Sequence, residues 1–301
     1  MTDRTTLGIL CMIAFSLIAP IMDAFAKATP AEVPVLQILS ARFGVQALVL
    51  VPLAMLLGFR VMPSLRDAGL HFLRAALILG ATGCFFLALR SMPIANAIAI
   101  FFVEPFILTL MGGFFLGEAI GPRRIIACIV GFGGALFVIK PSFADLGPVA
   151  LLPLVTAMLF AFYMIMTRSM AGRVHPIPLQ AQTASAALFL VMPLLWLFDD
   201  TGTPGLDPVW PTQFALMTLA GVGIVSTISH LFISFALRFA PAATIAPLQY
   251  LEIVSATVLG YYVFSDIPDG LTILGASIIV GSGLYVFARE RGLERRPTPA
   301  P

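Results

Sequence analysis

Two carboxylates stand in apolar stretches of the sequence, where acids are rare. Glu104 lies in FFVEPFILTL (101–110), and Glu252 lies in PLQYLEIVSA (247–256). A charged side chain facing hydrocarbon costs about 2.5–3.5 kcal/mol, so both should face protein or water. They either line a polar pathway or are structural acids, paired with Arg42 or protonated and bonded to a neighbouring helix. A carboxyl group in a pathway could also carry a coupling proton.

A proline accompanies each of these carboxylates. Pro105 directly follows Glu104, and Pro247 precedes Glu252 by five residues. Because proline has no backbone N–H, each one removes a helical hydrogen bond and kinks its helix. Backbone carbonyls freed in this way are tolerated at membrane depth only against protein or a water-filled cavity. The sequence therefore predicts two kinked segments that face a shared polar interior.

Five further residues near these prolines are candidates for lining that interior. Asn96 and Thr244 begin the polar sides of the two kinked segments, where they could hydrogen-bond a substrate or a neighbouring helix. Gln249 adds a second amide. Phe101 and Tyr250 offer flat rings on which a substrate could stack.

Three arginines have possible roles at the same interior or at its ends. Arg42 is the only basic residue that we place deep within an apolar segment, where it could grip a carboxylate or phosphate of a substrate, or bind Glu104. Arg90 and Arg238 each stand three residues before a proline. They are either cations favoured at helix C-termini or a symmetric pair of gate residues.

The elements that carry these residues follow from the composition. Hydrophobic residues make up 59% of the 301 positions, charged residues make up 11%, and the mean hydropathy is +1.02. A soluble domain carries about 25% charged residues, so the chain is predicted to be an all-α integral membrane protein. A span needs about 20 apolar residues. Ten segments meet this requirement: 7–26, 34–58, 70–89, 93–117, 122–140, 147–167, 178–198, 211–237, 242–264 and 270–288.

The distribution of Lys and Arg predicts the orientation. With a cytoplasmic N-terminus, 13 of the 17 basic residues fall on the cytoplasmic side, with Arg74 counted among them. Lys27, Arg90 and Lys140 fall outside, and Arg42 lies within a span. Because basic residues concentrate in cytoplasmic loops, we expect a multi-pass protein of the inner (cytoplasmic) membrane with both termini in the cytoplasm.

The two kinked segments also belong to an internal repeat. At a constant offset of 148, Arg90 aligns with Arg238 and Glu104 with Glu252. Each half would hold five spans, an odd number, so the second half enters the membrane upside down, as in many secondary transporters. The expected units are a first repeat at 1–141, an inverted repeat at 142–290 and a cytoplasmic tail at 291–301, enclosing a central cavity.

Other function classes find little support in the sequence. A net charge of +2 without basic clusters does not indicate a nucleic-acid partner. The chain has no P-loop and is therefore not expected to be an ATP-driven motor, and nothing in the sequence indicates an ATPase subunit as a partner. The three scattered cysteines and three scattered histidines predict neither a metal site nor a cofactor. The glycines of GFGGALFVI (131–139) and GASIIVGSGLYVF (275–287) favour close helix packing rather than nucleotide binding.

The sequence resembles the EamA branch of the drug/metabolite transporter superfamily. The resemblance rests on LGE (116–118) followed by GPRRIIACIVGFGGALFVIKP (121–141), with a weaker copy in FSD (264–266) and residues 275–287. It implies no enzyme but a secondary transporter that moves a small organic metabolite by alternating access. Riboflavin uptake is the narrow hypothesis. The alternatives are export of amino acids or related metabolites, import of S-adenosylmethionine and, outside the resemblance, an intramembrane enzyme.

Overall fold

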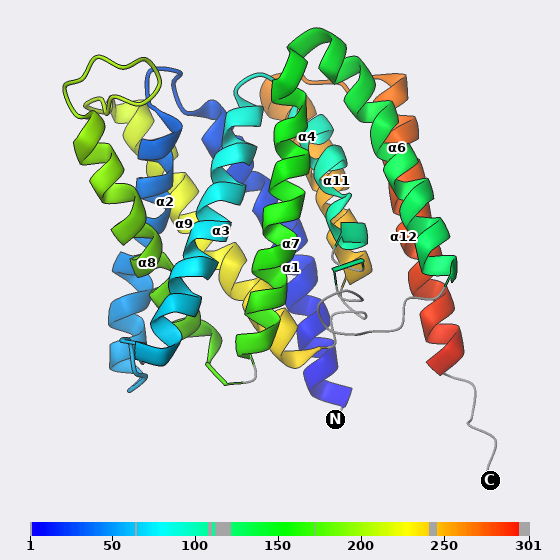
Figure 1. Cartoon of the computed structure of the whole chain (residues 1–301), viewed down its shortest axis with the longest axis horizontal. Coiled ribbons are helices and arrows are strands. Elements are labelled where there is room, and N and C mark those ends of the chain that lie inside the picture. The colour runs from blue at the N-terminus through cyan, green and yellow to red at the C-terminus, as the bar shows by residue number, and fades with distance from the viewer. Residues whose placement is uncertain are drawn as a thin grey trace.

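Helix follows helix along the chain in the computed structural model (Figure 1), which describes residues 2–63, 65–107, 110–111, 122–171, 173–240 and 246–294. Within these ranges there is no strand, and the prediction of an all-α protein is confirmed. The elements are α1 (Thr2–Ala28), α2 (Val35–Leu56), α3 (Leu65–Leu89), α4 (Ile94–Phe101), α6 (Pro122–Leu146), η1 (Gly147–Leu151), α7 (Leu152–Ala171), α8 (Pro176–Phe198), α9 (Gln213–Phe239), η2 (Ala246–Tyr250), α11 (Leu251–Phe264) and α12 (Gly270–Glu294), where η denotes a 3-10 helix.

Polar and apolar side chains are distributed over the helices as in a membrane protein. Six helical stretches of the described chain are long and apolar enough to cross a bilayer, and three shorter apolar helices accompany them. Large apolar side chains cover the outside, including Leu48 at 75% exposure and Phe189 at 69%. Polar side chains such as Arg42 and Gln46 are buried instead. Because this distribution suits lipid outside and polar groups inside, the chain is a multi-pass membrane protein.

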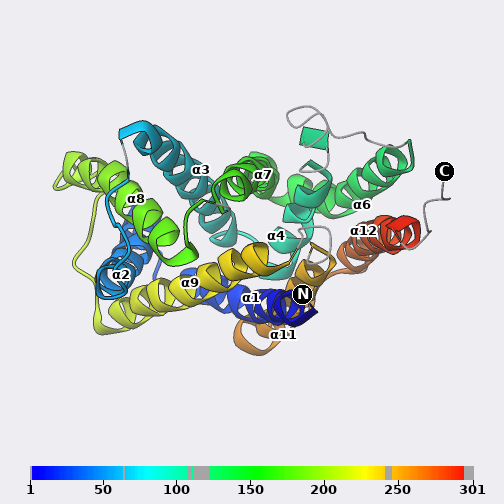
Figure 2. The same ribbon diagram turned by 90° about the horizontal axis from the view of Figure 1, so that it is seen from below.

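The helices run between two ends of the molecule (Figure 1). The N-terminal end of α1 and the C-terminal end of α12 lie at the same end, which we call the terminal end. The α1–α2, α3–α4, α8–α9 and α11–α12 connections lie at the other end, which we call the loop end. Neighbours in space are distant in sequence, because α1 packs along α9, α2 along α8, α3 along α7 and α6 along α12 (Figure 2).

Both segments that we expected to kink are irregular. After α4 the helix is interrupted at Phe102 and Val103 and resumes at Glu104. Pro105 thus lies in the first turn of the resumed helix, where a missing N–H removes no hydrogen bond. In the second segment Pro247 lies in the 3-10 helix η2, directly before α11. The expected span 93–117 is therefore not one continuous helix, and 108–109 and 112–121 lie outside the described residues.

Glycines bring α6 and α12 into close contact, as the sequence predicts. A Cβ atom added at Gly275 would lie 2.6 Å from the carbonyl oxygen of Gly134, and one added at Gly134 would lie 3.0 Å from that of Gly275. Backbone atoms cannot move aside as a flexible side chain can. Small residues at such crossings let helices approach closely.

We expect Gly275→Ala to destabilise this contact. Overpacking of a close contact costs about 1–3 kcal/mol, so the melting temperature of the detergent-solubilised protein should fall. Gly281→Ala on the same helix is the matched control, because a Cβ there meets nothing within 4 Å. Equal melting temperatures for the two variants would contradict the packing role of Gly275.

Candidate functional site

A cavity lies inside the bundle, between helices from the two ends of the sequence. Its empty volume is about 630 Å³, counted with the space at its open side. Residues of α1, α2, α3, α4, α7, α9, η2 and α11 line it. Side chains from eight helical elements therefore face one shared space.

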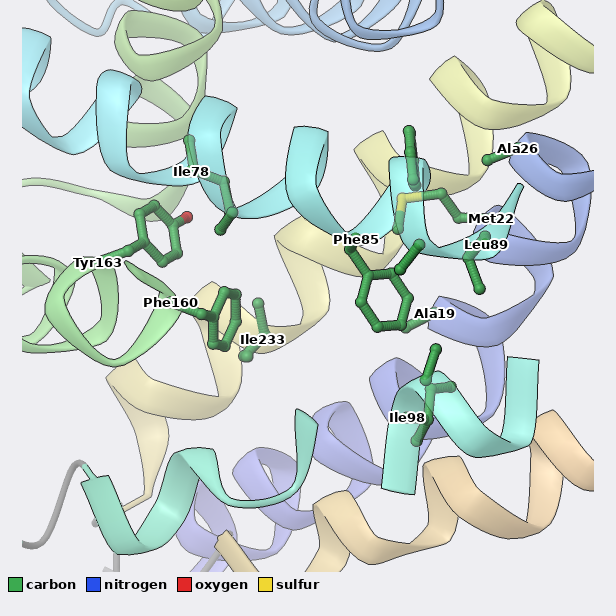
Figure 3. Close-up of a cluster of buried hydrophobic side chains, with 14 of the residues drawn as sticks. Ala19, Met22, Ala26, Ile78, Phe85, Leu89, Ile98, Phe160, Tyr163 and Ile233 are labelled. Atoms are coloured by element: carbon green, nitrogen blue, oxygen red, sulfur yellow. The ribbon is translucent and has the colours of Figure 1, made fainter. Parts of the chain in front are cut away.

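Aromatic rings form much of the cavity wall. Phe15, Phe85, Phe86, Phe101 and Phe160 all line it. The ring of Phe101 contacts that of Phe160 edge to face, with 5.5 Å between centroids. Phe85 and Phe160 point into a shared interior from α3 and α7 (Figure 3). Such walls offer stacking surfaces to a flat substrate.

Arg42 brings a buried positive charge to this cavity. Its side chain is 1% exposed, donates to the hydroxyl of Thr82, and has one terminal nitrogen 2.6 Å from Nε2 of His230. Its Nε finds no hydrogen-bond partner among the described residues. A buried guanidinium without a full set of acceptors is costly, and an anionic group of a ligand would satisfy it.

Carboxylates line the same cavity. Asp23 on α1 and Glu252 on α11 are 5% and 6% exposed. Oδ1 of Asp23 has no hydrogen-bond partner among the described residues. Asp23 interacts electrostatically with both Arg42 and Glu252. The cavity therefore offers acidic and basic groups side by side with aromatic walls.

Glu104 is buried close to this site but does not line the cavity. It is 2% exposed, and its Oε1 has no hydrogen-bond partner in the described chain. It interacts electrostatically with Glu252 and Tyr250. Among the described residues, Arg42 forms no ion pair with Glu104 or Glu252. It contacts Thr82 and His230 instead.

The other candidates near the prolines divide into two groups. Phe101 and Gln249 line the cavity. Tyr250 does not, and its ring lies beside that of Phe102, with 5.3 Å between centroids. Asn96 is half-buried away from the lining, and its Oδ1 has no partner among the described residues. Thr244 lies outside the described residues.

Arg90 and Arg238 lie at opposite ends of the bundle. Arg90 donates to the carbonyls of Thr29, Pro30 and Val33, and so holds the α1–α2 connection at the loop end. Arg238 is exposed in the last turn of α9 at the terminal end. Partial burial and the nearby Arg238 guanidinium lower the pKa of His175, which precedes α8.

The structure corrects the sequence analysis on Arg74, which we counted among the cytoplasmic charges. Arg74 is fully buried, so Arg42 is not the only basic residue deep within a span. It donates to the hydroxyls of Tyr163, Thr167 and Thr183, and thereby ties α3 to α7 and α8. Arg74 lies four residues inside the expected span 70–89, and this position in the sequence could have predicted its burial.

Asp23 and His230 are the two ionisable cavity residues that the sequence analysis overlooked. Asp23 lies inside the expected span 7–26, and an ionisable residue within a span marks a functional site by default. His230 was considered only as a metal ligand. Its role here is contact with Arg42. No three His, Cys, Asp or Glu side chains in the described ranges are grouped to hold a metal.

Comparison with known proteins shows to which family the chain belongs. The model of the EamA-like transporter family matches residues 6–140 and 147–288. The riboflavin transporter of Rhizobium johnstonii is 28% identical over 75% of this chain and 72% of its own length. The pseudopaline exporter of Pseudomonas aeruginosa is 27% identical over 96% and 99% of the two chains.

A third relative and a solved structure extend the comparison. The S-adenosylmethionine uptake transporter of Rickettsia prowazekii is 24% identical over 96% of this chain and 95% of its own. A crystal structure 18% identical to this chain superposes with a TM-score of 0.64 over 98% and 99% of the two chains, which shows a shared fold. Since the family model matches nearly the whole sequence, the resemblance to EamA proteins is confirmed, and the chain belongs to the EamA-like transporter family.

Proposed function

We propose that the chain is a secondary transporter of the cytoplasmic membrane that carries a small organic metabolite by alternating access. The observation that carries the proposal is the cavity between the helices. Arg42, Asp23 and Glu252 bring charge to its wall in a chain whose outer surface is apolar. A membrane protein tolerates such groups where a polar solute passes, and a catalytic role is not needed to explain them.

The two-repeat architecture is part of this proposal. The family model matches two segments, close to the expected repeats 1–141 and 142–290. Adding the offset of 148 to α3 (65–89) gives 213–237, close to the observed α9 (213–239). Adding it to α6 (122–146) gives 270–294, the bounds of α12. These correspondences support ten crossings in two inverted halves around the cavity.

The proposed orientation places both chain ends in the cytoplasm. Arg60, Arg168, Arg173 and Arg238 belong to helix ends and connections at the terminal end. Lys27 and Arg90 belong to the loop end. Because basic residues favour the cytoplasmic side, the terminal end faces the cytoplasm and the loop end faces outward.

Riboflavin is the first substrate candidate, because a flat heterocycle suits a cavity walled by five phenylalanines. Purified protein in liposomes should take up labelled riboflavin faster than empty vesicles do. An imposed pH gradient across the same vesicles tests whether a proton is coupled to uptake. The transport assignment fails if neither riboflavin, nor aromatic amino acids, nor a wider metabolite panel crosses faster than into empty vesicles.

A zwitterionic metabolite is the second candidate, and the charges of the cavity favour it. Arg42 suits a carboxylate, while Asp23 and Glu252 suit an ammonium or sulfonium group. Amino acids and S-adenosylmethionine carry both kinds of group.

Three ligands that share an indole ring distinguish this class from a neutral heterocycle. Tryptophan carries both charges, tryptamine lacks the carboxylate, and indole-3-propionate lacks the ammonium. If the substrate is zwitterionic, each truncated ligand should bind at least about tenfold more weakly than tryptophan, because hydrogen bonds to charged groups contribute about 1.5–3 kcal/mol. Competition for binding to the purified protein measures this. Equal binding of all three contradicts a zwitterionic substrate.

A further inference from the structure

One ion pair at the loop end joins the first helix, α1, to the connection that precedes the last helix, α12. Nζ of Lys27, in the last turn of α1, lies 2.5 Å from Oδ2 of Asp266. Asp266 directly follows Ser265, whose left-handed backbone (φ 57°) ends α11. The same ammonium donates to the carbonyl of Met92 in the α3–α4 connection, 3.2 Å away. Lys27 thus ties the end of α1 to two connections, α3–α4 and α11–α12.

On α1, Lys27 continues the face that lines the cavity. Phe15, Ala19, Met22 and Asp23 line the cavity from this helix. Residues four apart lie on the same helical face, so Lys27 stands one turn beyond Asp23, towards the loop end. Figure 3 shows Ala19, Met22 and Ala26 following one another along this part of α1. The face of α1 therefore runs from the cavity directly to Lys27.

On α11, a buried face leads from the cavity to Asp266. Glu252 lines the cavity, and Ala256 and Gly260 continue the same buried face at intervals of four residues. At its end, the Cβ of Asp266 lies 3.7 Å from where a Cβ of Gly260 would stand. The cavity faces of α1 and α11 thus converge on one ion pair.

We propose that Lys27 and Asp266 are gate residues that close the loop end of the cavity and separate when this end opens. The inference rests on the proposed transport function. The side chains are 17% and 23% exposed, so water and salt can weaken their attraction, as suits a contact that must break in each cycle. Arg90, by contrast, donates to backbone carbonyls of the α1–α2 connection and acts as a structural tie.

Cysteine labelling tests the gate without any substrate. In a variant lacking Cys11, Cys84 and Cys128, a single cysteine replaces Ala81, which lines the cavity on α3. A membrane-impermeant maleimide is applied to the protein in liposomes from the loop-end side. The side is identified separately with Pro204→Cys in the exposed α8–α9 connection.

Breaking the ion pair should make position 81 more accessible from that side. Lys27→Ala and Asp266→Asn should each speed labelling by up to about fivefold, the most that a partly exposed ion pair supports. The double variant Lys27→Asp with Asp266→Lys should restore the slow rate. Unchanged rates in both single variants, or fast labelling in the double variant at normal protein level, overturn the proposal.

Gln37→Ala is the matched control at the same end. Gln37 exchanges two hydrogen bonds with the backbone of Val209, at 2.8 and 3.1 Å, but lies away from the cavity lining. Its loss should leave labelling of position 81 unchanged. Equal acceleration in this variant means general loosening of the loop end and refutes a specific gate. Labelling needs no solute, so the gate can be tested even if the uptake assays identify no substrate. The two proposals can therefore fail separately.

Discussion

Arg42→Met should reduce transport by at least about thirtyfold, towards the level of empty vesicles. Arg42 is the buried cation of the cavity, and its Nε lacks a partner among the described residues, so it can bind an anionic or polar group of the solute. Losing one partner of a buried, hydrogen-bonded charged contact costs about 2–5 kcal/mol. Methionine fills a similar volume, so the substitution leaves little empty space in the cavity wall. Initial uptake rates, normalised to protein inserted, measure the effect.

The matched control for this experiment is Arg238→Met. Arg238 is exposed at the end of α9, so its removal should lower transport far less than the removal of Arg42. Equal losses would support a gate role for Arg238 and weaken the special role of Arg42. Normal flux in Arg42→Met would exclude the guanidinium from solute recognition.

Glu252→Gln should slow transport by at least about tenfold while leaving insertion into the membrane unchanged. Glutamine keeps the shape and hydrogen-bonding reach of glutamate but removes its charge and its ability to exchange a proton. Glu252 lines the cavity and interacts electrostatically with Asp23. Hydrogen bonds to charged groups contribute about 1.5–3 kcal/mol, which corresponds to tenfold or more in rate. Flux measured beside protein level separates loss of mechanism from loss of protein.

Glu104→Gln is measured alongside, because Glu104 is equally buried but lies outside the cavity lining. We expect it to impair transport as well, but less than Glu252→Gln, since Glu104 acts on the cavity through its interaction with Glu252. Normal flux in both variants would remove both carboxylates from the mechanism. A larger loss in Glu104→Gln would mean that the solute path runs beside Phe102 and Glu104 instead.

The helices were predictable because their signals are local. Apolar runs of sufficient length predicted an all-α membrane protein, and charged residues and prolines marked many helix ends. The predicted helix boundaries were less accurate where the helical hydrogen bonds and the apolar run end at different residues. The segment expected at 122–140 continues through Pro141 to Leu146. The segment expected at 93–117 is interrupted after Phe101, because an apolar run does not show where the backbone stops bonding to itself.

The candidate site was only partly predictable. Glu252, Arg42, Phe101 and Gln249 were recognisable as polar or aromatic residues in or beside spans, and the structure places all four on one cavity. Asp23 could have been found by the same reasoning. The residues that surround Asp23 in space could not have been predicted. The distance between two residues along the sequence does not show which faces of distant helices meet.

By itself, the sequence determined the membrane class, the helical content and the family, since composition, proline position and short motifs are properties of the chain. Only the tertiary structure decided that Arg42 contacts His230 and Thr82 rather than Glu104, and that Lys27 meets Asp266. The physical reason is that each contact joins separate elements of the fold. Which side chains meet depends on how every helix is rotated and paired in the bundle.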